Sequence, residues 1–367
     1  MSKWTKEEDI KLKELVEKGL LTEEIAKMMN RSFRSIVHRR ADVTRGKPKM
    51  QKEVVVKEKS KPISAIIIQT LKDELGKVTP LERTEKTARL IKKGDTLCVD
   101  FSDWHLGRLV RDEGGNELYN EKIFEERINV LLNEILTLLD DYISKGTPIK
   151  DVAIISTGDI LDGMGIFASQ ETVSEMSPPL QVMKATEVIK NFILALLNRK
   201  LTVNLYGVKG NHGEIRGEGG KQKDPEANWD LMLYLILDFW AKTILKDKKV
   251  QIHYSELDYL NFEIQGWKYH IRHLAPRDAD TPSGKAKFLG WAKKHGCQVI
   301  VSGHWHHYLI TDRSGITVIR GGSVSGIDDL AERMAEESEP IQLIWGCSKN
   351  RPVSFMYAID LGKRKRK

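Results

Sequence analysis

VAIISTGDILD, the stretch at residues 152–162, decides the fold class of this chain. Its first five residues are apolar or small and predict a buried strand, after which Gly158 permits a sharp turn. The turn leaves Asp159 at the carboxyl end of the strand, which is where open α/β sheets bind their ligands. A carboxylate has two oxygens, so Asp159 can bridge two cations.

The chain around this stretch alternates between short apolar runs and long amphipathic ones. We predict strands at residues 96–100, 152–156 and 201–208, and helices at residues 121–143, 180–198 and 225–245. This alternation is typical of an α/β sandwich with several parallel strands. Beyond residue 250, paired runs at 259–264 with 267–273 and at 308–312 with 316–320 predict hairpins in a second, more antiparallel sheet.

Four further polar clusters follow predicted strands. DWH at residues 103–105 and GHWH at residues 303–306 each space two polar residues two apart, and an extended chain points such a pair the same way. GNHG at residues 210–213 supplies an amide oxygen and an imidazole. The remaining cluster offers two histidines, and we favour His273 at the strand end over His270, for which we expect a packing role.

Oxygen and nitrogen ligands in this mixture suit Mn²⁺, Fe²⁺ or Zn²⁺ better than Ca²⁺. The order DxH, GDxxD, GNH, H and GHxH, spread over residues 97–360, is similar to that of the calcineurin-like metallophosphoesterase superfamily. The resemblance implies an αββα sandwich of mixed sheets and two divalent ions, with Mn²⁺ favoured. It implies that one ion is bound by Asp103, His105 and His306. The other ion is bound by Asn211, His273 and His304, and Asp159 binds both.

The resemblance also implies a mechanism. Two cations about 3.5 to 4 Å apart bind a bridging hydroxide and polarise the phosphoryl oxygens, so that attack occurs in line without a covalent enzyme intermediate. His212 is left to face the substrate, either as a phosphate contact or as proton donor to the leaving oxygen. We therefore predict His212 and Asp159 as catalytic residues.

Two positions depart from the family pattern. Gly213 stands where an acidic residue often follows GNH, and Gly163 stands where an arginine often follows GDxxD in the phosphatase branches. Phosphatase-type substrate recognition is therefore not expected. Arg108, Arg216 and Arg277 lie near the clusters in sequence and could contact phosphate, or could be solvated surface residues.

The first forty residues predict three short helices. Thr5 and Glu8 form a capping box, a second helix fits residues 22–29, and Ser32 can cap a third at residues 33–40. One face of the third helix suits phosphates and base edges. The predicted DNA contacts are Arg31, Arg34, His38, Arg39 and Arg40. The Trp4 opening and the run RSFRSIVHRR resemble Myb-type or related helix-turn-helix domains, and the alternative is a small protein-binding bundle.

Charge separates the ends of the chain from its body. Residues 1–62 contain 17 Lys or Arg against 10 Asp or Glu, and residues 363–367 are all basic. This asymmetry favours a polyanion such as DNA as partner. We predict a helix-turn-helix domain at residues 1–41, a linker with connecting helices at 42–93, a metallophosphoesterase domain at 94–362 and a basic tail at 363–367.

The composition, with 40% apolar and 30% charged residues, is that of a globular protein. We find no uncharged apolar run of about 18 residues and no apolar secretory core at the start, so we expect no membrane partner and a cytoplasmic location. Cys98, Cys297 and Cys347 are widely spaced without a zinc-ribbon pattern, which indicates packing residues in a reducing compartment.

These features together predict a metal-dependent phosphodiesterase that acts on DNA as an endo- or exonuclease, similar to the DNA repair nuclease branch of the superfamily. One alternative is a phosphomonoesterase or nucleotide phosphodiesterase that is localised by its DNA-binding domain. The other is a non-catalytic DNA-binding regulator that keeps the fold.

Overall fold

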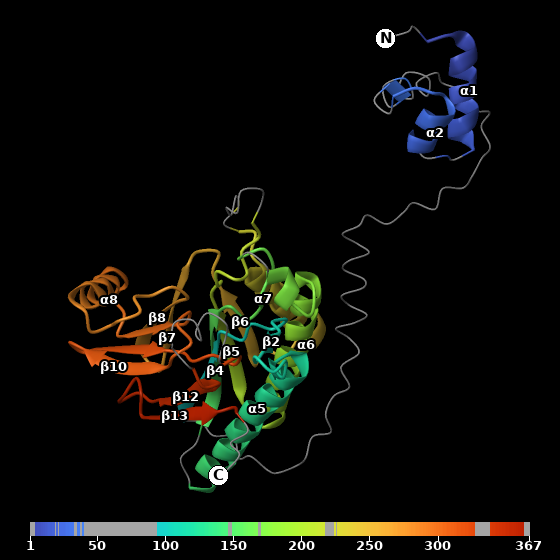
Figure 1. Ribbon diagram of the computed structural model, residues 1–367. Helices are drawn as coiled ribbons and strands as arrows, with labels where there is room; N and C mark the ends of the chain where they lie inside the picture. The colour runs from blue at the N-terminus through green and yellow to red at the C-terminus, as the bar shows by residue number, and fades with distance from the viewer. Residues whose placement is uncertain are drawn as a thin grey trace. The chain divides into compact units, whose positions relative to one another are not determined.

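Figure 1 shows the computed structural model of the chain. The structure describes residues 4–18, 20, 22–32, 35–36, 39, 94–145, 149–167, 170–216, 224, 226–326 and 338–362. The chain divides into two compact units, Met1–Ile66 and Ile67–Lys367, each with its own internal contacts. The predicted linker at 42–93 and the basic tail at 363–367 lie outside the described residues.

Two helices form the described part of the first unit, α1 (Lys6–Glu17) and α2 (Thr22–Met28). The predicted capping box is confirmed, because Thr5 Oγ1 accepts from the Glu8 amide at 3.2 Å and Glu8 Oε2 accepts from the Thr5 amide at 3.0 Å. Apolar side chains from both helices and from Ile36 form a small core. Of the predicted third helix, residues 35, 36 and 39 are described, and all three are helical.

Basic side chains hold this unit together. Arg31 donates from Nε and Nη2 to Glu8 at 3.1 and 2.9 Å, and Arg39 donates to Asp9 at 2.7 and 2.6 Å. Both guanidinium groups lie over the Trp4 ring, at 4.9 and 5.8 Å. Two predicted DNA contacts therefore pair within the unit, and the other three lie outside the described residues: Arg34, His38 and Arg40. A DNA contact by any of the five stays a prediction.

The second unit contains a six-stranded mixed sheet. Its strands, in spatial order, are β13 (Phe355–Asp360), β12 (Ile341–Cys347), β1 (Asp95–Ser102), β4 (Ile149–Gly158), β5 (Thr202–Gly207) and β6 (Val250–Tyr254). Strands β1, β4, β5 and β6 run parallel, and β12 runs antiparallel to both of its neighbours, β1 and β13. Three helices supply the apolar residues that cover one face: α5 (Glu121–Ser144), α6 (Pro178–Asn198) and α7 (Trp229–Phe239) (Figure 1).

A second sheet of five strands packs on the other face. Its strands, in order, are β10 (Leu309–Arg313), β11 (Ile316–Arg320), β9 (Val299–Ser302), β8 (Trp267–Arg272) and β7 (Tyr259–Ile264). Both predicted hairpins are present at its edges. We expected a more antiparallel sheet, and the structure has antiparallel pairs at both edges, but β8, β9 and β11 at its centre are parallel. The reason is that α8 (Pro282–His295) connects β8 to β9 as a crossover, a segment that the sequence did not reveal.

Successive side chains of the central strands point to opposite faces of the first sheet and so contribute to two separate cores. In β1, Leu97 and Val99 pack beneath the helices, whereas Cys98 belongs to the core between the sheets. A third apolar cluster lies on the outer face of the second sheet, where Phe288 of α8 packs. The resulting order of helices, sheet, sheet and helix is the predicted αββα sandwich. All three cysteines are free and buried, as the sequence predicts.

Some boundaries differ from the prediction. The helix expected at 225–245 begins at Trp229, because Asn228 is extended and its side chain accepts from the amides of Asp230 and Leu231. It continues as a π-helical segment, Trp240–Leu245. The remaining described elements are β2 (Val110–Arg111), β3 (Glu117–Tyr119) and the 3-10 helix Gln170–Val173. None of the helices in the described part of the chain combines the length and the apolar composition needed to cross a membrane.

Asp100, in the middle of β1, is a buried carboxyl group close to the backbone of Gly321. Neither of its oxygens has a hydrogen-bond partner among the described residues. Burial, and secondarily the charge of Asp103, raises the pKa of Asp100 well above its usual value.

The raised pKa of Asp100 makes the protein less stable as pH rises. Above the unfolded pKa of about 4, the unfolded chain loses this proton while the folded chain keeps it. We expect the free energy of unfolding of Asp100→Asn, relative to the unchanged protein, to grow by up to about 1.4 kcal/mol per pH unit as the pH rises above about 4. Urea denaturation in the presence of a chelator measures this difference, and a difference independent of pH contradicts the assignment.

Candidate metal centre

Five loops that follow strands meet at one edge of the two sheets. Asp103 and His105 follow β1, Asp159 follows β4, Asn211 follows β5, His273 follows β8, and His304 and His306 follow β9. The loops after β1 and β4 run side by side, since the Asp103 amide donates to Gly158 O at 3.2 Å and the His105 amide donates to Asp159 O at 3.0 Å. All seven predicted ligands therefore lie in one place.

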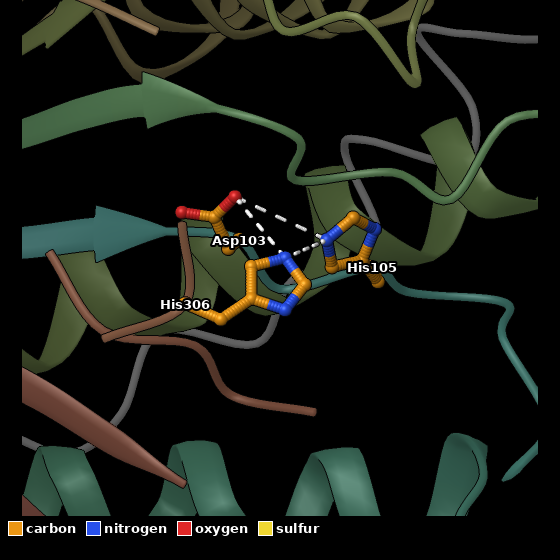
Figure 2. Close-up of side chains that lie close together, drawn as sticks. All are labelled: Asp103, His105 and His306. Atoms are coloured by element: carbon orange, nitrogen blue, oxygen red, sulfur yellow. Dashed lines mark hydrogen bonds and ion pairs between the residues drawn. The ribbon is translucent and has the colours of Figure 1, made fainter. Parts of the chain in front are cut away.

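The first group joins the DWH and GHWH loops. Figure 2 shows the Asp103 carboxylate and the imidazoles of His105 and His306 directed toward one another. The two Nε2 atoms lie 3.0 Å apart. Oδ1 of Asp103 lies 3.6 Å from His306 Nε2 and 4.0 Å from His105 Nε2. Three potential ligand atoms thus surround one point.

The second group gathers around His273. Its Nε2 lies 3.0 Å from Asp159 Oδ2, 2.9 Å from Asn211 Oδ1 and 3.2 Å from His304 Nδ1. Asp159 also lies close to His105 and His212, which together form a third group of potential ligands. Asp159 therefore belongs to the second and third groups, and His105 links it to the first.

The contacts of His273 fit a bound cation. Nδ1 of His273 lies 2.9 Å from the carbonyl oxygen of Thr157 and must donate to it, because a carbonyl oxygen only accepts. Its Nε2 then faces the oxygens of Asn211 and Asp159, which are also acceptors. A cation or a second proton between these atoms is needed to make the contact favourable.

The distances between imidazole nitrogens fit as well. Nitrogens held about 2.1 Å from one ion at tetrahedral or octahedral angles lie about 3.0 to 3.4 Å apart, as the two measured pairs do. Burial lowers the pKa of both His105 and His304 to about 4. The neutral imidazole is the form that binds metal ions.

The electrostatics of the centre favour a cation too. Burial raises the pKa of Asp103 to about 7, although His273 acts in the opposite direction. Burial also opposes ionisation of Asp159, but His273 and His212 hold the pKa of that carboxyl well below its usual range. Burial lowers the pKa of His273, but Asp159 outweighs it and raises that pKa to about 9. An ionised carboxylate at the middle of a buried site attracts positive charge.

Five of the seven residues have left-handed backbone conformations. Their φ angles are 50° at Asp103, 48° at His105, 53° at Asp159, 79° at His304 and 59° at His306. The prediction of an extended DxH step is therefore wrong, because alternate residues turn sharply while Trp104 between them is buried in the core. Such a conformation costs about 1 to 2 kcal/mol for each residue that is not glycine, and strain of this kind gathers at functional sites.

Glycines precede Asp159, Asn211 and His304 because neighbouring loops pack closely against the backbone there. A Cβ atom on Gly210 would collide with Asp159, and one on Gly303 would lie 2.6 Å from Ser102 Oγ and 2.7 Å from Asp103 Oδ2. Any larger residue would push the loops apart. The glycine in each of the GN and GH motifs is thus explained by close approach.

Asp230, at the start of α7, fixes two of these loops and was missed by sequence reasoning. Its buried carboxylate accepts from the amides of Asp159 and Gly210, both at 2.9 Å, and from that of Leu161 at 3.3 Å. Asn228 adds a bond from Nδ2 to Gly210 O at 2.9 Å. In the sequence, Asp230 only marks the polar end of an apolar helix, and its spacing from the motifs gave no signal.

Asp162, the last residue of GDILD, lies beside two histidines and holds one of them, His212. Its Oδ1 lies 3.3 Å from Nδ1 of both His105 and His212, and 2.8 Å from Arg108 Nε. Nδ1 of His212 also lies 3.0 Å from the Asp162 carbonyl oxygen, so it must be the donor. Burial lowers the pKa of His212, but Asp159 and Asp162 outweigh it and raise that pKa. Gly163 is needed next, because a Cβ atom there would collide with the His212 carbonyl.

The other residues singled out in the sequence are engaged elsewhere. Arg108 pairs with Asp162, and Arg216 pairs with Glu214 at 2.8 Å. The guanidinium of Arg277 lies 5.8 Å from the centre of the Trp305 ring. His270 lies away from the ligand groups: its ring stacks on His295 with centroids 4.6 Å apart, and its Nδ1 lies 2.8 Å from Asn261 Oδ1. Of the two histidines in that cluster, His273 is the one that the structure brings to the centre.

Comparisons with known proteins agree with this architecture. Residues 101–308 match the model of the family described as Calcineurin-like phosphoesterase. The SPbeta prophage-derived uncharacterized protein YonJ of Bacillus subtilis (strain 168) is 23% identical over 296 residues, which are 77% of this chain and 67% of YonJ.

Two solved structures are among those similar to this chain. A novel archaeal phosphodiesterase is 16% identical with a TM-score of 0.34, and the match covers 72% of this chain and 99% of that protein. The hypothetical protein PH1004 from Pyrococcus horikoshii OT3 is 13% identical with a TM-score of 0.38, and the match covers 74% and 90%.

Asp230→Asn tests the support of the centre. The amide keeps the size of the side chain but cannot accept three backbone bonds with its single oxygen. We expect the affinity for Mn²⁺ to fall by about 10- to 100-fold and the free energy of unfolding to fall by about 1 to 3 kcal/mol. Calorimetric titration and chemical denaturation measure the two changes.

Asp238→Asn, at the last turn of the same helix, is the matched control. Asp238 pairs there with the exposed Lys242 at 2.7 Å, so the affinity for Mn²⁺ should not change. Equal effects of the two substitutions on affinity would show that Asp230 supports the helix rather than the loops.

Proposed function

The chain belongs to the calcineurin-like phosphoesterase family, and from this premise we propose that it is a metal-dependent phosphodiesterase that acts on DNA. The observation that carries the proposal is that two ligand groups are linked through Asp159, which lies close to His273 and His304 on one side and to His105 and His212 on the other. One group of proposed ligands is Asp103, His105 and His306, and the other is Asn211, His273 and His304. When bound there, two divalent cations supply charge that acidifies water and balances the phosphoryl group.

The residues of the chain supply orientation and a proton. Asp162 accepts from Nδ1 of His212 and so leaves Nε2 of that ring for the substrate. The ring lies at the edge of the centre, with its centroid 4.5 Å from that of His105. We infer that protonated His212 donates from Nε2 to the leaving oxygen of the ester. Arg108 neutralises part of the negative charge on Asp162, because its Nε lies 2.8 Å from Oδ1.

The choice of DNA as substrate is supported by charge. The first 62 residues have an excess of seven basic over acidic residues, and the last five are all basic. Both segments flank the phosphoesterase body and would raise the local concentration of a polyanion. The predicted helix-turn-helix domain at residues 1–41 would bind DNA through its third helix. Mn²⁺ is the ion that we propose, with Fe²⁺ or Zn²⁺ as alternatives.

The direct test is cleavage by the metal-loaded protein. We expect Mn²⁺-dependent hydrolysis of supercoiled, linear or single-stranded DNA, lost on chelation and restored by added Mn²⁺. His273→Asn should abolish it, because this residue contacts three of the other proposed ligands. His270→Gln is the matched control, since it changes a buried histidine of β8 outside the centre, and it should retain activity.

The same assay distinguishes the alternatives. Hydrolysis of a mononucleotide or a cyclic nucleotide without any cleavage of DNA would replace this proposal with a phosphomonoesterase or nucleotide phosphodiesterase. Metal-loaded protein that hydrolyses none of these esters would point instead to a non-catalytic DNA-binding protein.

His212→Asn tests the proton donor. An alkoxide leaves poorly without a proton, so we expect a loss of about 10²- to 10⁴-fold in kcat for a diester with an alkyl leaving group. A 4-nitrophenyl ester needs no such proton, and its hydrolysis should fall far less. An equal loss for both esters would assign to His212 a role in binding phosphate rather than in proton transfer.

A further inference from the structure

Phe167 is an exposed aromatic side chain beside the proposed proton donor. Its side chain is 45% exposed, and its ring centroid lies 6.2 Å from that of His212 with the planes at 62°. In the described part of the chain, Phe167 belongs to none of the apolar clusters that form the cores. Single exposed apolar residues are common, so exposure alone decides nothing. What indicates a function is the position of this ring beside His212, together with the hydrogen bonds that hold the adjacent backbone.

Hydrogen bonds fix the backbone just before Phe167. The Ile166 amide donates to Gln170 Oε1 at 2.9 Å, and the Ile166 carbonyl accepts from Arg216 Nη1 at 2.7 Å. Arg216 is itself held by Glu214. The ring therefore stands on a braced turn, and an aromatic group that is already in place binds a flat ligand with little loss of entropy.

The turn shares its support with the proposed proton donor. Gln170, which is buried, donates from Nε2 to Asp162 O at 2.7 Å and to Asp162 Oδ2 at 2.9 Å. The same Asp162 accepts from Nδ1 of His212. One buried network thus sets both the direction of His212 and the place of Phe167.

We propose that Phe167 stacks on the nucleobase of the nucleotide on the leaving-group side of the scissile phosphate. This proposal rests on the proposed function, in which His212 faces the leaving oxygen. A ring about 6 Å from that imidazole lies within reach of the nucleotide that the oxygen belongs to. A base offers its face only when it is unpaired, so the preferred substrate is single-stranded or frayed DNA rather than an intact duplex.

The test uses the full chain with Mn²⁺ and a single-stranded oligonucleotide in which one phosphodiester is cleavable and all other linkages are phosphorothioates. We expect Phe167→Leu, which keeps an apolar side chain without a ring, to lower kcat/KM by about 5- to 100-fold. Phe167→Trp should retain it. Removing the base on the leaving-group side should lower kcat/KM of the unchanged protein by a similar factor.

The decisive measurement combines the Phe167→Leu substitution with the abasic oligonucleotide. If ring and base stack on each other, the abasic oligonucleotide should be cut no more slowly by Phe167→Leu than by the unchanged protein. If the losses in kcat/KM from removing the ring and from removing the base multiply, the two groups act independently and the proposal is overturned. A preference of the unchanged protein for duplex over single-stranded DNA would also overturn it. Failure of the unchanged protein to cut any DNA would instead overturn the proposed function.

A binding measurement gives a second readout without turnover. In Asp159→Asn, 2-aminopurine at the leaving-group position should lose fluorescence on binding, because stacking quenches it. The loss should persist with Phe167→Trp added and disappear with Phe167→Leu added. Quenching that is unchanged by Phe167→Leu contradicts the stacking, and unchanged thermal unfolding of the Phe167 variants confirms that the fold is intact.

Discussion

Asp103 and Asp159 bury two carboxylates within one small site, and burial of charge is favourable only where hydrogen bonds or opposite charges compensate it. The surrounding loops are shaped to provide that compensation. Both oxygens of Asp103 accept from the His304 amide at 3.0 and 2.9 Å, and Asp159 Oδ1 accepts from the His212 amide at 2.7 Å. These bonds require the backbones to approach closely and to turn to the left-handed side at the ligands. The αββα frame, with its rigid strands, holds that strain in place.

Parallel strands explain why residues so far apart in sequence meet. The carboxyl ends of β1, β4 and β5 lie at one edge of the first sheet, and those of β8 and β9 lie at the adjoining edge of the second. Each strand therefore delivers one loop with one or two ligand residues, and a glycine precedes the ligand after β4, β5 and β9. Asp230 then ties two loops together from the N-terminus of a helix. The frame supplies position and the loops supply chemistry.

Residues that stand directly after a strand, such as Asp159 and His273, could be predicted because strand periodicity marks the place, and Gly158 marks it as well for Asp159. The alternation of elements also gave the fold class. The crossover through α8 was not predicted, because its helix contains two glycines and four lysines and has little apolar periodicity. Asp230 was not predicted because its partners are backbone amides, which leave no side-chain pattern in sequence. The left-handed turns at Asp103 and His105 were likewise missed, since two-residue spacing alone looks extended.

Asp162 connects the chemistry of the site with recognition of its substrate. Its Oδ1 is directed toward His105, His212 and Arg108, while its Oδ2 and carbonyl oxygen hold Gln170. Asp162 thus holds the proposed proton donor and lies beside one proposed ligand, and through Gln170 it also supports the backbone before Phe167. Because a buried network tolerates little independent movement of its members, a base that stacks on this turn also sets the position of the leaving oxygen relative to His212. The proposed stacking and the proposed delivery of a proton would therefore depend on one buried network.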